Sequence, residues 1–369
     1  MQIGISTSLI DIDLQTKSLD GVGVYTNALF KEYIQSNRSP VGFVFPQKMT
    51  NSSYHKLPAS YKELALRGLN PFSKPVQMPV DIFHVTDYRG FRMSCPSITT
   101  LYDAIPFLGT EMANQKRRQL KNFFLKRSAQ FADHVIAISN FSTLELIKYY
   151  GIPESKISVV YCGVDETWLT SPSQEQITSV LDKYKLQRGY FLNVGTLQPR
   201  KNVSRLIHAH NQMPAKKRKQ HPLVVVGKKG WNCEELIKEL QLKASIGEAI
   251  WLSNVGSRED LKCLYGGAEA FLFPSLHEGF GLPILEAFAM GVPVLTSNSS
   301  SLPEVSMGIG LEIDPFDVNQ IAEGMLQLLN FPDRAKKIES GIARAKEFSW
   351  KKSANETYKV YQNVLSGKL

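Results

Sequence analysis

Two glutamates in an apolar stretch are the residues of this chain whose setting most strongly suggests chemistry. Glu278 and Glu286 stand eight positions apart in HEGFGLPILEAFAMG, residues 277–291. Buried carboxylates need hydrogen-bond donors or cations as partners. Sugar hydroxyls, such as a ribose diol, would supply such donors to Glu286. The alternative is that Glu286 complements a helix dipole and Glu278 is a solvated loop charge.

The same stretch predicts a helix start that could bind an anion. Pro283 suits the first helical residue, and Gly291 with Pro293 just beyond it suits a helix end. These signals predict a helix over about 283–290. The open backbone N–H groups at such a start, near Gly281, form a favourable site for a phosphate group.

A second loop, GTLQPRKN (195–202), places two cations before another expected helix. Arg200 and Lys201 stand at the positive end of that helix, where cations are disfavoured, and Asn202 is the expected N-cap. Both cations make sense there if an anion binds them. Arg offers a hydrogen-bonding fork and Lys a point charge, which together suit a diphosphate. A solvated basic loop is the alternative.

Short apolar runs that alternate with helical segments must position these loops. Such continuous apolar strands favour an α/β fold with two doubly wound parallel sheets. In parallel sheets, ligands bind beyond the carboxyl ends of the strands, where both loops stand. The clearest runs are FLNVG (191–195), LVVVG (223–227), AIWLSNV (249–255), FLFPS (271–275) and VPVLTS (292–297).

The length of 369 residues suits two domains. We expect an N-terminal domain over 1–168 and a C-terminal domain over 169–348. A last helix over 349–369 either docks on its own domain or crosses back to the N-terminal one, and the sequence leaves both open.

Composition limits the class of protein further. The net charge of +9 fits nucleic acid, anionic lipid or phosphorylated small molecules, but KKRK (216–219) is expected to be a solvated loop, so no nucleic acid partner is predicted. Four cysteines without a CxxC pair favour a reduced, cytoplasmic protein without a structural metal. Neither a secretory signal nor a membrane-spanning run is visible. Asp11-Ile12-Asp13 forms a DxD motif, for which a solvated loop is expected rather than a metal site.

A basic helix over 115–127 carries six cations together with apolar and aromatic residues. Leu120, Phe123, Phe124 and Leu125 in such a setting suit the surface of an anionic membrane. A solvated face over a packed stripe explains the same pattern, so both interpretations stay open.

Together these motifs resemble those of a known family. Glu278 to Glu286 inside HEGFGLPILEAFAMGVPVL is similar to the donor-site motif of GT-B retaining glycosyltransferases, the group 1 or family 4 enzymes. GTLQPRKN, LVVVGKKGW and FSWKKSANETYKVY are similar to further stretches, and the likeness runs from about Phe83 to Tyr361. The resemblance implies a GT-B fold: two Rossmann-like domains facing across a cleft that holds the active site.

The resemblance also implies roles for individual residues. Glu286 would hold the nucleotide ribose, and Glu278 would contact the donor sugar. Arg200, Lys201 and the helix start would stabilise the leaving diphosphate without a metal or cofactor. The leaving phosphate oxygen would then accept the acceptor's proton. Catalysis is therefore assigned to Glu278, Arg200 and Lys201, and donor binding to Glu286, Gly195, Val255, Phe280, Gly281, Leu282 and the glycine-rich loop of Gly21 and Gly23.

One position departs from the family pattern. Tyr102-Asp103 stands where the family has His-Asp, and that histidine contacts the donor sugar. Tyr102 could substitute through its hydroxyl, with Asp103 beside it on the sugar and acceptor side. His84 is a second candidate, although a core histidine at a strand end is the favoured interpretation.

The resemblance therefore implies transfer of a hexose, with mannose from GDP-mannose favoured, to a glycan or lipid-linked saccharide in cell-surface polysaccharide synthesis. The expected location is the cytoplasm or the inner face of the membrane. Alternatives are a UDP-hexose-dependent transferase and a non-catalytic sugar-nucleotide-binding protein. A glycoside hydrolase using the two glutamates would leave the cation pair unexplained.

Overall fold

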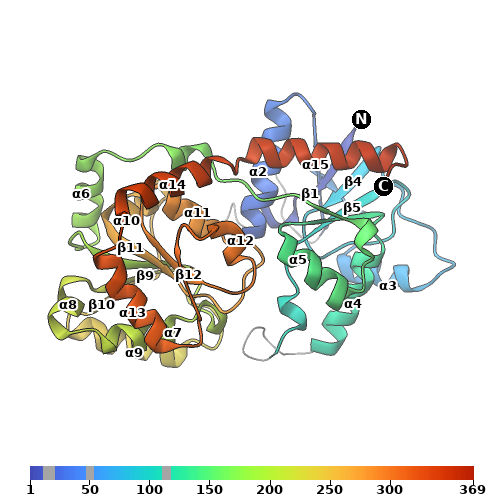
Figure 1. Cartoon of the computed structure of the whole chain (residues 1–369). Coiled ribbons are helices and arrows are strands. Elements are labelled where there is room, and N and C mark those ends of the chain that lie inside the picture. Colours follow the sequence, from blue (N-terminus) through green and yellow to red (C-terminus); the bar gives the residue numbers. More distant parts are fainter. Residues whose placement is uncertain (11–20, 47–53, 110–117) are drawn as a thin grey trace. The chain divides into compact units, whose positions relative to one another are not determined.

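The chain folds into two compact units, and each is described by itself (Figure 1). The computed structural model describes residues 1–10, 21–46, 54–109 and 118–369. Unit 1 comprises the described residues of Met1–Phe107, Gln115–Gly163 and Ser349–Leu369. Unit 2 comprises Val164–Phe348 together with the described part of Leu108–Asn114. The Asp11-Ile12-Asp13 motif lies outside the described residues.

Unit 1 is built on a parallel sheet in which the strand order is β3-β2-β1-β4-β5-β6-β7. Most of its strands are buried along their length, as expected for a sheet covered on both faces. The strands are β1 (Ile3–Ser6), β2 (Val41–Val44), β3 (His55–Lys56), β4 (Ile82–Val85), β5 (Ser97–Leu101), β6 (His134–Ala137) and β7 (Ile157–Val159). The α-helices are α2 (Gly21–Gln35), α3 (Tyr61–Leu69), α4 (Arg118–Gln130), α5 (Asn140–Glu145) and α15 (Trp350–Leu365), with the 3-10 helix η1 (Ile105–Phe107) and the π-helix η2 (Leu146–Tyr150).

Unit 2 has a second parallel sheet with the strand order β10-β9-β8-β11-β12-β13. Its strands are β8 (Tyr190–Val194), β9 (Leu223–Val226), β10 (Ala249–Leu252), β11 (Ala268–Phe273), β12 (Val294–Ser297) and β13 (Leu311–Ile313). Its helices are α6 (Gln174–Lys183), α7 (Val203–Gln212), α8 (Ala215–Gln220), α9 (Glu234–Ser245), α10 (Arg258–Gly267), α11 (Leu282–Ala289), α12 (Leu302–Ser306), α13 (Val318–Leu329) and α14 (Arg334–Lys346). The predicted α/β fold with two parallel sheets is confirmed.

The last helix, α15, belongs to unit 1 and lies beside α2 (Figure 1). The hydroxyl of Tyr33 on α2 donates to the carbonyl of Ala354 at 3.2 Å. Trp350 packs edge-on against Tyr25, with ring centres 5.9 Å apart. The chain therefore returns to the N-terminal unit after Phe348, which answers the question that the sequence left open. The change to the long segment of unit 2 falls after Gly163, a few residues before the position expected from the sequence.

None of the helices in the described part of the chain is long and apolar enough to cross a bilayer.

Candidate active site

Two loops at the carboxyl ends of neighbouring strands form the candidate site in unit 2. β8 and β11 pair in parallel, so the loops that follow them leave the sheet at the same edge. The first loop ends in a 3-10 turn over Pro199–Lys201, and α7 begins just beyond it. The backbone N–H of Leu276 in the second loop donates to the carbonyl of Arg200 at 2.7 Å. This hydrogen bond fixes the two loops against each other.

The two predicted cations meet on the carboxylate of Glu278. Arg200 Nη1 lies 2.8 Å from one carboxylate oxygen and Lys201 Nζ 2.6 Å from the other. Arg200 Nη1 also donates to the carbonyl of His277 at 3.2 Å. The sequence predicted an anion beside these cations, and the Glu278 carboxylate is one such anion. Two cations on one carboxylate still leave one net positive charge, which suits a further anion.

The two cations keep the carboxylate of Glu278 ionised. Burial alone raises the pKa of Glu278, but the charges of Arg200 and Lys201 outweigh it and lower the pKa to about 2. The side chains of the three residues are only 11 to 19% exposed. Their mutual attraction is therefore weakly screened by solvent.

Two neighbours hold Lys201 in place. Its ammonium lies 4.6 Å from the centre of the Phe273 ring, a cation–π contact. A Cβ added at Gly195, whose φ is 156°, would stand 3.3 Å from Lys201 Cε. Gly195 therefore supports the cation through close backbone approach.

Asn202 occupies the expected N-cap position of α7, but its side chain does not cap the helix. Its backbone is left-handed, with φ at 62°. The side-chain amide instead donates to the carbonyls of Pro274 and Pro315, at 2.9 and 2.7 Å. The prediction of a capping side chain was wrong: the side-chain oxygen, which would have accepted from the helix start, accepts from Arg205 Nη1 at 3.0 Å instead.

The helix start after Glu278 is built as the sequence predicts. α11 begins at Leu282 and ends at Ala289, within one residue of the prediction at each end. Gly281 precedes it with φ at 130°, where an added Cβ would meet Leu302 at 3.0 Å. Phe280 is buried, and its ring packs edge-on against Phe348 with centres 5.7 Å apart. The first N–H groups of a helix have no intrahelical acceptor, so this start can receive an anion.

Glu286 lies on α11 in a separate environment. It is half-buried, and the hydroxyl of Tyr265 on α10 donates to its carboxylate at 3.3 Å. Burial raises the pKa of Glu286 to about 7, against the opposing effects of Arg258 and Tyr265. Tyr265 and Arg258 were missed from the sequence because their helix carries no recognisable motif. Val255, half-buried, stands in the loop that leads into this helix.

The predicted sugar-side residues Tyr102 and Asp103 belong to unit 1. The Tyr102 hydroxyl donates to the carbonyl of Thr86 at 2.7 Å, and the side chain is buried. Its donor is therefore used inside the core rather than offered to a sugar. Asp103 is half-buried beyond β5, and one of its carboxylate oxygens accepts from the N–H of Ile105 at 3.0 Å.

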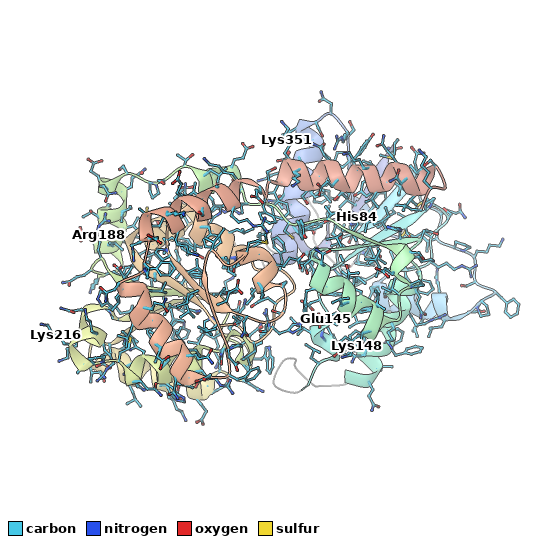
Figure 2. The ribbon with its side chains drawn as sticks, viewed as in Figure 1. His84, Glu145, Lys148, Arg188, Lys216 and Lys351 are labelled. Carbon is cyan, nitrogen blue, oxygen red and sulfur yellow. The ribbon has the colours of Figure 1, made fainter. Side chains whose placement is uncertain are left out.

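His84 is a core histidine. Its Nδ1 lies 2.6 Å from the hydroxyl of Tyr361 and its Nε2 2.7 Å from Thr100 Oγ1. Burial lowers the pKa of His84 to about 3, so the ring is neutral. Figure 2 shows it on the sheet side of α15. It is not a substitute for the family histidine.

The glycine-rich segment differs from the prediction. Gly21 and Gly23 are not in a loop but form the first turn of α2. Residues 11–20, which directly precede Gly21, lie outside the described part of the chain.

The described part of the basic segment 115–127 is helical and partly apolar at its surface. Leu120 and Phe123 on α4 are 58 and 48% exposed, whereas Leu125 is buried. Two more apolar side chains, Leu144 and Ile147, are 66 and 36% exposed on α5 and η2. α4 packs against η2.

No three His, Cys, Asp or Glu side chains gather as possible metal ligands within residues 1–10, 21–46, 54–109 and 118–369.

Two parallel-sheet units with a positively charged loop at a strand end are the arrangement expected of a GT-B glycosyltransferase. The model of the family "Glycosyl transferases group 1" matches residues 178–344, and that of "Glycosyltransferase Family 4" matches residues 28–168. The O-antigen chain mannosyltransferase B of Escherichia coli is 35% identical over 269 residues, which are 72% of this chain and 70% of that protein. The chain therefore belongs to the group 1 and family 4 glycosyltransferases, and it is a glycosyltransferase.

Other comparisons extend the likeness. The serotype-specific mannosyltransferase WbdA of Escherichia coli is 32% identical over 73% of this chain, but the match spans only 34% of that longer protein. Among solved structures, the sucrose-phosphate synthase of Thermosynechococcus elongatus superimposes with a TM-score of 0.75 at 18% identity over the full length of both chains. WaaG, a glycosyltransferase involved in lipopolysaccharide biosynthesis, gives a TM-score of 0.73 at 14% identity, covering 98% of this chain and 99% of its own. These structures show the GT-B fold.

Proposed function

We propose that this chain transfers a mannosyl residue from GDP-mannose to a hydroxyl of a glycan or lipid-linked saccharide in cell-surface polysaccharide synthesis, with retention of configuration and without a metal. The observation that carries the proposal is the pair Arg200 and Lys201 on the buried carboxylate of Glu278, which leaves a net positive charge beside the start of α11. Two relatives support the sugar, since the two Escherichia coli proteins named above are mannosyltransferases.

Electrostatics explains how these residues would promote the reaction. Breaking the bond between the sugar and the diphosphate builds positive charge on the anomeric carbon and negative charge on the leaving oxygen. Arg200, Lys201 and the start of α11 stabilise that oxygen in a setting where charge is poorly screened. Glu278, ionised and immobile, faces the sugar and supports its positive charge. Its role is electrostatic and positional rather than nucleophilic.

Retention follows if the acceptor attacks from the side that the diphosphate leaves. The leaving phosphate oxygen then takes the proton of the acceptor hydroxyl, so no separate base is required. The two cations supply the charge that a divalent metal would otherwise bring. Glu286 accepts hydrogen bonds from the ribose diol, which fixes the nucleotide along α11.

A panel of nucleotide sugars tests the donor. GDP-mannose should raise the melting temperature more than UDP- and ADP-sugars do, because a ligand that binds only the folded state stabilises it. Nucleotide release with GDP-mannose should continue undiminished in excess chelator. Stabilisation and turnover only by a UDP-sugar would overturn the choice of donor. Binding without turnover across many acceptors would instead favour a non-catalytic sugar-nucleotide-binding protein.

We also propose that a surface on unit 1 docks on an anionic membrane, where a lipid-linked acceptor would lie. This membrane patch consists of exposed apolar side chains beside cations: Leu120, Phe123, Leu144, Ile147, Lys121, Lys126 and Lys148. Lys148 is labelled in Figure 2. Ring contacts connect the part of the patch on α4 with the part on η2. Lys126 of α4 lies over the Phe107 ring, and Phe107 stacks on Tyr149 of η2. Apolar area with a basic rim suits the interface of a charged bilayer.

Sedimentation with lipid vesicles tests the membrane patch. The protein should sediment with phosphatidylglycerol-containing vesicles, less so at high salt, and not with neutral phosphatidylcholine vesicles. Phe123→Asp should abolish sedimentation. The matched control is Phe72→Asp, since Phe72 is 93% exposed in the same unit but lies outside the patch. Equal loss in both variants, or none in Phe123→Asp, would contradict the proposal.

A further inference from the structure

We infer that Ser300 and Ser301 are positioning residues that hold Glu278 in its reactive geometry. Together with Ser299 they form a serine turn between β12 and α12. The inference rests on the proposed function, because it assigns a supporting role in the same site. No sequence motif marked these residues.

Hydrogen bonds from the serine turn hold the backbone of Glu278 on both sides. The N–H of Glu278 donates to Ser300 Oγ at 3.2 Å. The hydroxyl of Ser301, which is fully buried, is shared between the carbonyls of Glu278 at 2.9 Å and Phe280 at 2.6 Å. The carboxylate is meanwhile fixed by Arg200 and Lys201. Glu278 is therefore restrained at its N–H, its carbonyl and both carboxylate oxygens.

The backbone of Ser300 is strained, which indicates that the surroundings impose its position. Its φ is 56°, in the left-handed region that residues other than glycine, asparagine and aspartate seldom occupy. Such strain costs about 1 kcal/mol and persists only where the surrounding structure enforces it. Here the left-handed turn brings Ser300 Oγ to the N–H of Glu278 while the same hydroxyl donates to the carbonyl of Ser299 at 2.7 Å. Glycine would fit this backbone better but would supply no hydroxyl.

The expected contribution is to turnover rather than to nucleotide binding. Arg200, Lys201 and Glu286 are the groups assigned to the nucleotide, whereas Ser300 Oγ is hydrogen-bonded to the backbone of Glu278 and of Ser299. A displaced Glu278, by contrast, would meet the sugar incorrectly, and misplacement by about 1 Å can cost roughly 100-fold in rate. The serine turn should therefore affect turnover and not nucleotide binding. Its loss should lower kcat while the affinity for GDP stays the same.

Three substitutions at Ser300 test the inference. Ser300→Gly removes the hydroxyl and relieves the strain, so the protein should remain folded while kcat falls about 10-fold or more and the Kd for GDP is unchanged. Ser300→Ala removes the hydroxyl but keeps the strain, and should show the same loss of kcat. Ser300→Asn tolerates the left-handed backbone and returns an acceptor oxygen, so it should recover most of the turnover. Hydrogen exchange of the Glu278 amide should be faster in the first two variants and close to normal in the third.

Met307→Gly is the matched control. Met307 has a φ of 52°, is 65% exposed, and lies in the same unit outside the serine turn. Its replacement relieves similar strain, and kcat and Glu278 exchange should not change.

The two arms of the experiment fail separately. Unchanged kcat in Ser300→Gly, or an unchanged Glu278 amide, would overturn the positioning role. A fall in melting temperature and GDP affinity along with kcat would show a merely structural role. A wild-type chain that is inactive with every donor would overturn the proposed function. If the Glu278 amide still exchanged faster in Ser300→Gly, the positioning of Glu278 by Ser300 would nevertheless be supported.

Discussion

Glu278 and Glu286 differ in acidity although both lie in one short segment of unit 2. The pKa of Glu278 is lowered to about 2 because its two cationic neighbours outweigh the effect of burial. The pKa of Glu286 is raised to about 7, since burial meets only weak compensation from Tyr265 and Arg258. Glu278 is therefore ionised at every working pH, whereas Glu286 changes its charge near neutrality.

Nucleotide affinity should follow the ionisation of Glu286. Only the carboxylate accepts hydrogen bonds from both hydroxyls of a ribose diol, because the protonated acid uses one oxygen as a donor. The affinity for GDP should therefore rise as the pH increases through about 7. Glu286→Gln should bind GDP about tenfold more weakly, with the pH dependence lost. Calorimetric titrations one unit below and one unit above that pKa measure the effect, and a persistent slope in the variant would contradict the assignment.

The same shifts affect stability in opposite directions. The folded pKa of Glu286 is above the ordinary value of 4.5, so its contribution to stability is present below 4.5 and is lost as the pH rises through about 7. The folded pKa of Glu278 is below 4.5, so its contribution is present above 4.5 and is lost as the pH falls toward 2. Denaturant unfolding of Glu286→Gln should therefore show a smaller loss of stability between pH 4.5 and 7 than the wild type.

Glu278→Gln should separate nucleotide binding from catalysis. The substitution leaves the two cations with one more unit of uncompensated positive charge. GDP should bind at least as tightly as to the wild type. Turnover should fall about 100-fold or more, because the Glu278 carboxylate proposed to face the sugar is removed. Weaker GDP binding would show that Glu278 orders the cations rather than serving the sugar.

Glu248→Gln is the matched control for that substitution. Glu248 is also a buried carboxylate between an arginine and a lysine, Arg218 at 2.9 Å and Lys243. Its loss should destabilise the fold by about 3 kcal/mol, as breaking a buried ion pair does, without changing GDP affinity.

Residue types and spacing identified the charged groups of the candidate site but not their partners. The pairing of Glu278 with Arg200 and Lys201 is a tertiary contact across 78 and 77 positions, respectively. Tyr102 shows the same limit. Its hydroxyl looked available for a sugar, but the fold places the carbonyl of Thr86 within 2.7 Å of it.

Among the elements, the start of α11 depends most on one backbone conformation. Gly281→Ala should destabilise unit 2 by about 1 kcal/mol or more, since φ at 130° disfavours a Cβ and Leu302 stands in its way. GDP affinity should fall with it, because the helix start moves. Gly308→Ala is the control: Gly308 also has a positive φ, of 69°, but an added Cβ meets nothing within 4 Å. Urea unfolding and GDP titration of both variants measure the difference, and equal GDP affinities would contradict a role for the helix start.

The helix α15 is tied to the sheet of unit 1 by a buried polar contact. Tyr361→Phe removes the hydroxyl that meets His84 Nδ1 at 2.6 Å. An unpaired buried nitrogen should lower the free energy of unfolding by about 1 to 3 kcal/mol. Tyr358→Phe, on the same helix but half-buried, should cost less. Urea unfolding would contradict the prediction if both variants lost the same stability.

The elements show where local pattern suffices and where it does not. α11 was predicted to within a residue because proline and glycine mark both of its ends. The segment of Gly21 and Gly23 was expected to be a loop from its resemblance to the family's glycine-rich loop, but the structure extends α2 through both. The destination of α15 could not be predicted, because an amphipathic helix shows that it has an apolar face and not which surface covers that face.

For the molecule as a whole, unit 1 is assembled from segments far apart in the chain. A variant lacking Ser349–Leu369 removes the partners of Tyr33, His84 and Tyr25. Unit 1 should then lose its cooperative unfolding, while unit 2 keeps its own core and binds GDP. Limited proteolysis should cut readily within residues 1–163 and spare 164–348. A protease-resistant unit 1 in this variant would contradict the role given to α15.

The interrupted course of unit 1 also sets the order in which the protein can be completed during synthesis. Domains usually finish folding from the N-terminus onward as the ribosome releases them. Here all of Val164–Phe348 emerges before the helix that completes unit 1. Unit 2 can reach its final fold while the earlier unit still exposes the surface that α15 will cover. The part of the chain made first is therefore the last to be finished, and until then it needs protection from aggregation.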